Sequence, residues 1–321
     1  MKKVVVTREV FDETIECLEE YFVVDANQRD EKLSRELIFD KIADADGIQT
    51  ASNDRVDEEF LAAARNVSII ANTAVGYNNI DLEACSKRNV IVTNTPGVLD
   101  QSVADFAIGL MIAACRRMGE AERYLRSGNW RSVYLKQMLG IDVHGATLGL
   151  VGFGRIGQEI AKRARGFSMR TLYHSRNQVD ATIERQLGAE FVNKDDLLRQ
   201  ADIVMLILPY SPATHHFIGE TELSLMKERA VLVNVARGGI VDDSALIRAL
   251  KDRRIYAAGL DVFEGEPAIN PEFLNLENVV LSPHIASGSE STRKAMAMTA
   301  ANNLVEVLAH GLPPLNWVNR E

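Results

Sequence analysis

Cysteine is scarce in this chain of 321 residues, which has three cysteines and no CxxC pair. Cys17, Cys85 and Cys115 are odd in number and widely spaced. A disulfide framework needs paired cysteines, and a cysteine-based structural zinc site needs them closely spaced. We therefore expect buried free thiols.

Histidine is also rare, with six residues that include one adjacent pair, His215 and His216. On an extended segment, adjacent side chains point to opposite faces, which would keep the two rings from sharing an ion. We therefore expect no metal.

Long apolar runs are absent as well. The longest, residues 106–115, is far shorter than the roughly 20 residues that cross a bilayer. The opening MKKVVVTREV turns polar too early for a secretory signal. We expect a cytoplasmic protein without a membrane partner.

Positive charge is in the minority, and the formal net charge is −9. Nucleic acids and anionic membranes need a clustered cationic face, so neither is the expected partner. A small anionic substrate stays compatible, because one arginine or a few backbone N–H groups can bind it. With 46% hydrophobic and 25% charged residues, the composition is that of a folded globular protein, and the length favours two domains.

Short β-branched runs alternate with helical patterns along the chain. In the first hundred residues the expected strands are 4–7, 47–52, 68–72 and 90–94, and the expected helices are 12–21, 57–64 and 81–88. A second series has strands at 147–151, 170–174, 203–208, 231–234, 257–260 and 279–281, with a helix over 156–166. This alternation predicts α/β architecture with parallel sheets.

Two long helical patterns connect the two series. One covers 101–125 after a turn at Asn94–Gly97, and the other covers about 290–310 and would return the chain to the first series. We expect a discontinuous first domain of residues 1–100 plus 286–321 and a second domain of residues 101–285. Ligands usually bind in the cleft between two such lobes.

A GxGxxG sequence lies between the expected strand 147–151 and the following helix. Its glycines are Gly152, Gly154 and Gly157. The first allows a tight turn, the second lets the backbone approach a pyrophosphate, and the third lets helix and strand pack closely. A turn without a ligand is the alternative, but this context favours a dinucleotide site.

The cofactor type is indicated by the end of the next strand, which reads Tyr173-His174-Ser175-Arg176. NAD enzymes normally place a carboxylate there to bind the ribose hydroxyls. Ser175 and Arg176 instead suit a 2′-phosphate, so NADP(H) is favoured. If Arg176 is only a solvated surface residue, NAD(H) is used.

Three charged side chains follow the ends of successive expected strands. Arg237, Glu266 and His284 follow 231–234, 257–260 and 279–281, and the ends of parallel strands meet at the ligand edge of a sheet. Reduction of a 2-oxo acid needs a cation for the carboxylate and ketone and an acid for the developing alkoxide. Arg237 suits the first task, and His284 paired with a carboxylate suits the second. Glu264 competes with Glu266, and spacing does not separate them.

The loop Ala74-Val75-Gly76-Tyr77 follows an expected strand and offers consecutive backbone N–H groups. Such a loop can bind a carboxylate, although an ordinary turn explains it equally well.

Together these segments resemble the D-isomer-specific 2-hydroxyacid dehydrogenase family. The motifs are VGYNNID at 75–81, VGFGRIG at 151–157, NVARGGIVDDSAL at 234–246, AAGLDVFEGEP at 257–267 and SPHIAS at 282–287. The resemblance implies a flavodoxin-like substrate-binding domain and a Rossmann domain for NAD(P). It also implies an oxidoreductase that forms dimers through the helix after the first domain.

The resemblance further assigns individual residues. It gives the catalytic roles to Arg237, Glu266 and His284, and it favours Glu266 over Glu264. It implies substrate contacts from Val75, Gly76, Arg237, His284 and Ser287. Besides the three glycines, it implies cofactor contacts from Arg155, Ile156, Ser175, Arg176, Pro209, Thr214, Val235 and Asp261, the last near the nicotinamide amide.

Within the family, the chain is most similar to glyoxylate/hydroxypyruvate reductases and 2-ketogluconate reductases, through residues 173–176 and the tail Asn316-Trp317-Val318-Asn319. We therefore expect NADPH-dependent reduction of a small 2-oxo acid to the D-2-hydroxy acid. The alternatives are an NAD-dependent dehydrogenase for a substrate such as D-3-phosphoglycerate or D-lactate, and a nucleotide-sensing protein like a corepressor. Formate dehydrogenases have glutamine where Glu266 stands, which argues against that activity.

Overall fold

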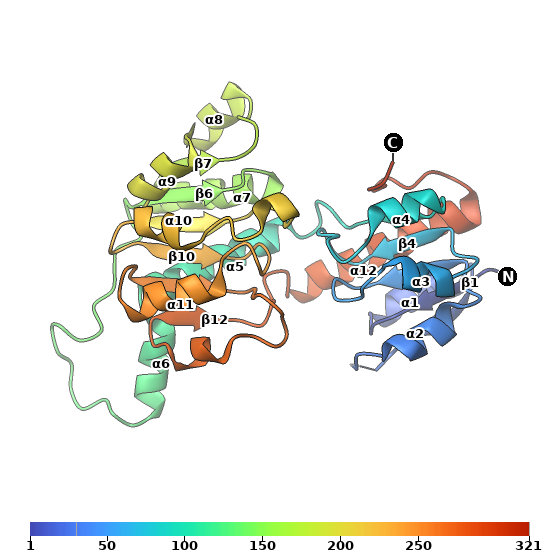
Figure 1. The fold of residues 1–321 in the computed structure, drawn as a ribbon, viewed down its shortest axis with the longest axis horizontal. Helices are drawn as coiled ribbons and strands as arrows, with labels where there is room; N and C mark the ends of the chain where they lie inside the picture. The colour runs from blue at the N-terminus through green and yellow to red at the C-terminus, as the bar shows by residue number, and fades with distance from the viewer. Residues whose placement is uncertain (30, 321) are drawn as a thin grey trace. The chain divides into compact units, whose positions relative to one another are not determined.

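The computed structural model describes residues 1–29 and 31–320, and the chain divides into two compact units (Figure 1). The first unit is residues 1–99 with 288–321, and the second is residues 100–287. Each unit is described here by itself.

The first unit is a five-stranded parallel sheet with strand order β2-β1-β3-β4-β5. Its strands are β1 (Lys3–Val6), β2 (Val23–Ala26), β3 (Gly47–Thr50), β4 (Ile69–Asn72) and β5 (Ile91–Thr93). Its helices are α1 (Asp12–Glu19), α2 (Arg35–Ile42), α3 (Glu58–Ala63), α4 (Leu82–Lys87) and α12 (Glu290–Val305), which a π-helical turn continues to His310. This strand order is the flavodoxin-like one.

Alternating residues of each strand cover both faces of this sheet. Val5 of β1 packs in a core with α2, α3 and α4, whereas Val4 and Val6 pack with α1 and α12. Successive strand side chains point to opposite faces, so a strand covered on both faces reads as a continuous apolar run.

The second unit is a seven-stranded parallel sheet with strand order β12-β11-β10-β9-β6-β7-β8. Its strands are β6 (Thr147–Val151), β7 (Arg170–His174), β8 (Ala189–Phe191), β9 (Ile203–Leu206), β10 (Val231–Asn234), β11 (Ala257–Leu260) and β12 (Val279–Leu281). Its helices are α5 (Asp100–Cys115), α6 (Met118–Arg126), α7 (Arg155–Ala164), α8 (Ala181–Leu187), α9 (Lys194–Gln200), α10 (Glu220–Leu225) and α11 (Asp243–Lys251). The chain order reverses between the interior strands β6 and β9, and ligands bind at the carboxyl ends of the strands beside such a reversal.

The two faces of this sheet have separate cores. Helices α5 and α7 pack with Val231 and Val233 of β10, and helices α9, α10 and α11 pack with Leu232 of the same strand. Burying one such side chain contributes about 1.5–3 kcal/mol to the free energy of folding. Packing on both faces of the sheet therefore fixes the positions of the strand ends that carry the charged residues.

Some sequence expectations need correction. The single helix expected over 101–125 is two helices, because Arg117 is left-handed, with φ 52°, between α5 and α6. Strand β2 and helix α2 in the first unit were not expected, nor was β8 in the second. Strands β2 and β8 lie at sheet edges, are short and are partly exposed, so their sequences lack the buried apolar run of a central strand.

Free thiols are confirmed at Cys17, Cys85 and Cys115. Cys85 and Cys115 are buried and Cys17 is half-buried. Burial raises the pKa of the Cys85 and Cys115 thiols to about 12, so both stay protonated. Among the described residues, no helix has the length and hydropathy needed to cross a membrane.

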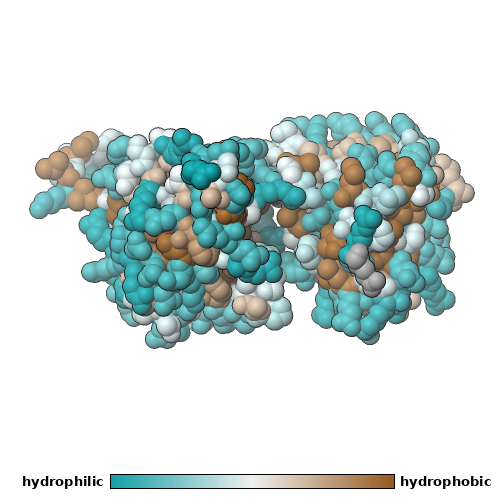
Figure 2. All heavy atoms as spheres, turned by 90° about the horizontal axis from the view of Figure 1, so that it is seen from above, coloured by the Kyte–Doolittle hydropathy of each residue, from teal (hydrophilic) through white to brown (hydrophobic). Residues whose placement is uncertain are grey.

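The segment from α6 to residue 139 exposes apolar side chains. Apolar atoms lie at the left end of the molecule in Figure 2, and Figure 1 shows this segment on the same side. The exposed side chains are Met118, Leu125, Trp130, Val133, Tyr134, Leu135 and Leu139. So many neighbouring exposed apolar groups are typical of an interaction surface.

Candidate active site

The glycine-rich turn joins β6 to α7, and its three glycines differ in the space around them. Gly152 has φ 100°, and a Cβ there would lie 2.6 Å from the Ile207 carbonyl oxygen. A Cβ on Gly157 would lie 2.7 Å from the Gly152 carbonyl oxygen. Gly154 has an extended backbone, and a Cβ there would meet nothing within 4 Å. The fold therefore requires Gly152 and Gly157, whereas Gly154 leaves open space at the helix start.

The N-terminus of α7 is suited to an anion. Gly154 is its N-cap, no side chain caps it, and its first turn contains no acidic residue. Arg155 is exposed and Ile156 is half-buried in that turn. Unpaired N–H groups and the helix dipole favour a phosphate at such a terminus.

The end of β7 lies beside this turn, because β7 pairs with β6. Tyr173 is buried against Phe153, and its hydroxyl donates to Glu184 at 2.7 Å, so it is not available to a ligand. Ser175 is half-buried and its Oγ donates to the Asn177 carbonyl, whereas Arg176 is exposed. Within the described chain the Arg176 guanidinium has no ion-pair partner, so its charge faces solvent at this edge.

Arg237, Glu266 and His284 come together at the carboxyl end of the same sheet. His284 Nδ1 lies 2.6 Å from Glu266 Oε1, and Glu266 Oε2 accepts the Phe263 N–H at 3.2 Å. Arg237 is half-buried after β10, and its charge interacts with Glu266. Glu264 lies instead beside His216, so the geometry separates the two glutamates that spacing left open.

The electrostatics of the three groups are coupled. Burial by itself would raise the pKa of Glu266, but the hydrogen bond to His284, the His284 charge, the Phe263 N–H and Arg237 hold that pKa below its ordinary value. Burial lowers the pKa of Arg237, and Glu266 partly opposes this effect. Glu266 is therefore an ionised acceptor for the His284 ring.

Asp261 fixes the turn that carries His284. Its buried carboxylate accepts hydrogen bonds from Ser282 Oγ at 2.7 Å and from the N–H groups of Ile285 and Ala286 at 2.9 Å each. His284 has φ 53°, which is unusual for a residue with a side chain and is held by this network. The resemblance implied only a nicotinamide contact for Asp261, and sequence reasoning missed this structural task.

Asn234 is a second residue that sequence reasoning missed. It is buried at the end of β10, its Oδ1 accepts the Ala236 N–H at 3.1 Å, and its Nδ2 donates to the Arg237 carbonyl at 3.3 Å. An asparagine directly after a buried strand is a typical signal for such a side-chain-supported turn.

The other residues expected at the cofactor follow β9 and β10. Pro209 is exposed, Val235 is buried, and Thr214 is half-buried. Thr214 Oγ1 donates to the Pro209 carbonyl at 2.9 Å and accepts the Ser211 N–H at 2.7 Å, so it holds the loop after β9. Ser287 is half-buried at the end of the second unit.

In the first unit, the Val75 and Gly76 carbonyls are held by side-chain amides. Asn94 Nδ2 donates to Val75 O and Asn72 Nδ2 donates to Gly76 O, each at 2.9 Å. Within the described chain, the N–H groups of Val75 and Gly76 have no acceptor. This loop can therefore donate two hydrogen bonds to an anion.

The expectation that the side chains of His215 and His216 point to opposite faces was wrong. His216 has φ 49°, which turns its side chain to the same side as His215, and the two rings stack with centroids 3.8 Å apart. The opposite-face argument holds only for extended backbone.

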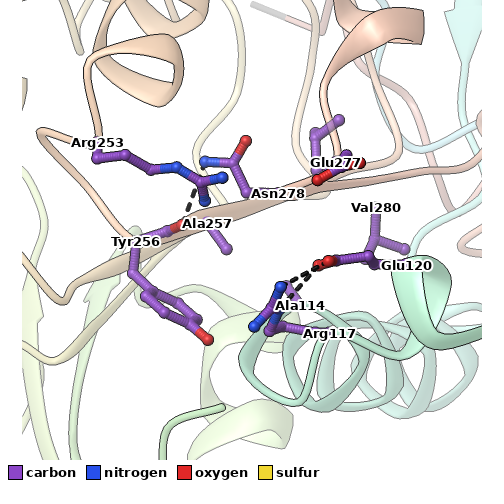
Figure 3. Close-up of a pocket in the computed structure, with 10 residues that line it drawn as sticks. Ala114, Arg117, Glu120, Arg253, Tyr256, Ala257, Glu277, Asn278 and Val280 are labelled. Atoms are coloured by element: carbon purple, nitrogen blue, oxygen red, sulfur yellow. Dashed lines mark hydrogen bonds and ion pairs between the residues drawn. The ribbon is translucent and has the colours of Figure 1, made fainter. Parts of the chain in front are cut away.

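A pocket of about 200 Å³ lies at the amino ends of strands β11 and β12 (Figure 3). It is lined by the starts of β11 and β12 and by Arg117 and Glu120, which form an ion pair. Because His284 and Glu266 follow the opposite ends of these strands, this pocket is separate from the candidate active site.

Comparison with known proteins identifies the family. Residues 108–286 match the model of the D-isomer specific 2-hydroxyacid dehydrogenase NAD binding domain. Glyoxylate reductase of Thermococcus onnurineus is 45% identical over 99% of this chain and 96% of its own length.

Solved structures agree. A glyoxylate reductase from Paecilomyes thermophila has a TM-score of 0.89 at 33% identity, covering 99% of this chain and 98% of the other. The NADPH-dependent glyoxylate/hydroxypyruvate reductase of Sinorhizobium meliloti has a TM-score of 0.84 at 32% identity, covering 99% and 97%. The chain belongs to the D-isomer-specific 2-hydroxyacid dehydrogenase family and is an NAD(P)-dependent oxidoreductase that reduces a 2-oxo acid.

Proposed function

We propose that the protein reduces a small 2-oxo acid with NADPH to the D-2-hydroxy acid, with His284 as the proton donor. The hydrogen bond of 2.6 Å between His284 Nδ1 and Glu266 carries this proposal. It orients the ring and leaves Nε2 as the atom that gives a proton to the developing alkoxide. Glu266 holds the ring in this orientation through its contact with Nδ1.

When bound, a reduced nicotinamide would supply hydride to the keto carbon of the substrate. Arg237 binds the substrate carboxylate and polarises the ketone, because its planar fork suits a carboxylate and burial strengthens its field. The N–H groups of Val75 and Gly76 are further carboxylate donors. Ser287 borders the substrate, as the family resemblance implies.

For the cofactor, we propose that Gly152, Gly154 and Gly157 place the pyrophosphate at α7, with Arg155 and Ile156 in the first helical turn. Ser175 and Arg176 bind the 2′-phosphate of NADPH, since an exposed arginine stands where NAD enzymes have a carboxylate. Pro209, Thr214 and Val235 are further cofactor contacts, and Asp261 lies near the nicotinamide amide. Replacing Ser175 and Arg176 with alanine should raise the KM for NADPH far more than that for NADH, and equal effects would refute this role.

The proposed substrates are glyoxylate, hydroxypyruvate and 2-ketogluconate. Support comes from relatives named glyoxylate reductase and glyoxylate/hydroxypyruvate reductase. A panel of 2-oxo acids of graded length, followed by NADPH and NADH absorbance, tests both substrate and cofactor. Cofactor binding without turnover on any 2-oxo acid would favour a nucleotide-sensing protein instead.

We also propose a homodimer that covers the apolar segment from α6 to residue 139. The exposed Leu135 is 94% accessible and Trp130 is 52% accessible, which is costly for a monomer surface. Light scattering should give twice the chain mass of 35.5 kDa, and a Leu135→Glu variant should shift toward monomer. A monomeric mass for the unaltered chain would contradict the dimer.

A further inference from the structure

Two histidines and one glutamate meet on the surface of the second unit. The candidate ligand atoms of His215, His216 and Glu264 all lie within 4.8 Å of one another. His216 Nε2 is 3.3 Å from both carboxylate oxygens of Glu264, and the His215 ring stacks on the His216 ring. The left-handed backbone at His216 creates this arrangement, which an extended chain would not allow.

We propose that His215, His216 and Glu264 bind one divalent transition-metal ion of the zinc type. Imidazole nitrogens together with a carboxylate suit Zn²⁺, Co²⁺, Ni²⁺ and Cu²⁺, whereas Mg²⁺ and Ca²⁺ prefer sites made only of oxygen. Three protein ligands would leave a fourth position to water. The side chains of His216 and Glu264 are 37% and 44% accessible, so an ion reaches them directly from solvent.

The surrounding contacts anchor the segments that carry these ligands, whose stacked rings must turn for both in-plane lone pairs to reach one ion. Tyr210 OH lies 3.3 Å from His215 Nδ1, so an Nδ1–H donating to that oxygen leaves His215 Nε2 with a lone pair for the ion. The His216 N–H donates to the Gly239 carbonyl at 2.8 Å, and the Glu264 N–H donates to Asp243 Oδ2 at 3.1 Å. Both ligand segments are therefore anchored by their backbones, which lowers the entropic cost of binding.

The ion would connect two segments of the candidate active site. His215 and His216 directly follow Thr214, and Glu264 lies two residues before Glu266. A bound ion therefore fastens the loop after β9 to the segment that carries Glu266. Since it binds the folded chain, it should also raise the thermal stability with increasing metal concentration.

The test uses the full chain without a histidine tag, freed of metal with a chelator. Titration with Co²⁺ alone should give visible d–d absorption at one equivalent per chain, and Zn²⁺ should displace it. His216→Ala and Glu264→Gln should each raise the Kd by at least about 10–100-fold, the loss that even an outer-shell partner causes. His144→Ala, which alters another exposed histidine, should bind like the unaltered chain.

Circular dichroism and Tm in the presence of chelator would show that the variants are folded. Equal Co²⁺ affinity in the unaltered chain, His216→Ala and Glu264→Gln would overturn the site. Binding at several equivalents without a saturating step would also overturn it. Because the readout is metal absorption, its failure is distinguishable from a failure of the proposed reductase activity.

Discussion

Replacing Gly154 with alanine should weaken cofactor binding without harming the fold. The residue is exposed, its φ of −74° and ψ of −161° are accessible to alanine, and the added Cβ meets nothing within 4 Å. As an N-cap, alanine is worse than glycine by roughly 0.5–1 kcal/mol, but the stiffer unfolded chain returns about 0.4–1 kcal/mol. The net change in unfolding free energy should therefore be close to zero.

The affinity for the cofactor should fall, because the methyl group would occupy the space where a pyrophosphate approaches α7. Losing one charge-assisted N–H hydrogen bond costs about 1.5–3 kcal/mol, which corresponds to roughly a 10–100-fold higher Kd. Fluorescence titration with NADPH measures this loss directly, and thermal denaturation of the cofactor-free protein measures the fold.

Two matched variants separate the effects. Gly157→Ala would place its Cβ 2.7 Å from a backbone carbonyl, so it should lower the Tm even without cofactor. Gly166→Ala also meets nothing within 4 Å but is away from the turn, so it should leave both quantities unchanged. The reasoning fails if Gly154→Ala binds NADPH like the unaltered chain, or if its Tm drops as far as that of Gly157→Ala.

Three further predictions concern the catalytic segments. Gly238→Ala puts a Cβ 1.7 Å from the Phe263 carbonyl oxygen, so the segment before Glu266 must shift by about 1 Å. A shift of this size should lower kcat about 100-fold. Steady-state kinetics measures this loss, and an unchanged kcat would contradict the prediction. The pKa of Glu266 is lowered in the fold, so its contribution to stability is present above the ordinary glutamate pKa and lost as the pH falls through the lowered value. Glu266→Gln should remove this acid-side dependence from unfolding curves, and an unaltered pH profile would argue against the pairing. Burial raises the pKa of Asp243 to about 6, so its favourable contribution is present at low pH and is lost as the pH rises through about 6. Asp243→Asn should therefore be more stable than the unaltered chain at pH 8, by about 1–2 kcal/mol, with the gain absent at pH 4.

Much of this protein is determined locally by its sequence. The central strands are buried on both faces, so each one reads as a short apolar run followed by a turn, and the strands 147–151 and 231–234 were predicted at their observed bounds. The glycine spacing at 152–157 predicted the strand, turn and helix, because steric demands of a tight turn act over a few residues. Strand-end positions likewise brought Arg237, Glu266 and His284 to one edge.

Only the tertiary structure decided features that depend on partners distant in the sequence. The edge strand β2 has no buried apolar pattern, and only its pairing with β1 defines it. Glu264 and Glu266 both follow strand β11 closely, and spacing along the chain does not distinguish them. In the structure, Glu264 contacts His216 and Glu266 contacts His284. The same holds for His215 and His216, whose rings stack because one residue adopts a left-handed conformation that no sequence period predicts. Local sequence patterns determine the strands and helices, whereas the side-chain contacts in the loops after the strands depend on three-dimensional packing.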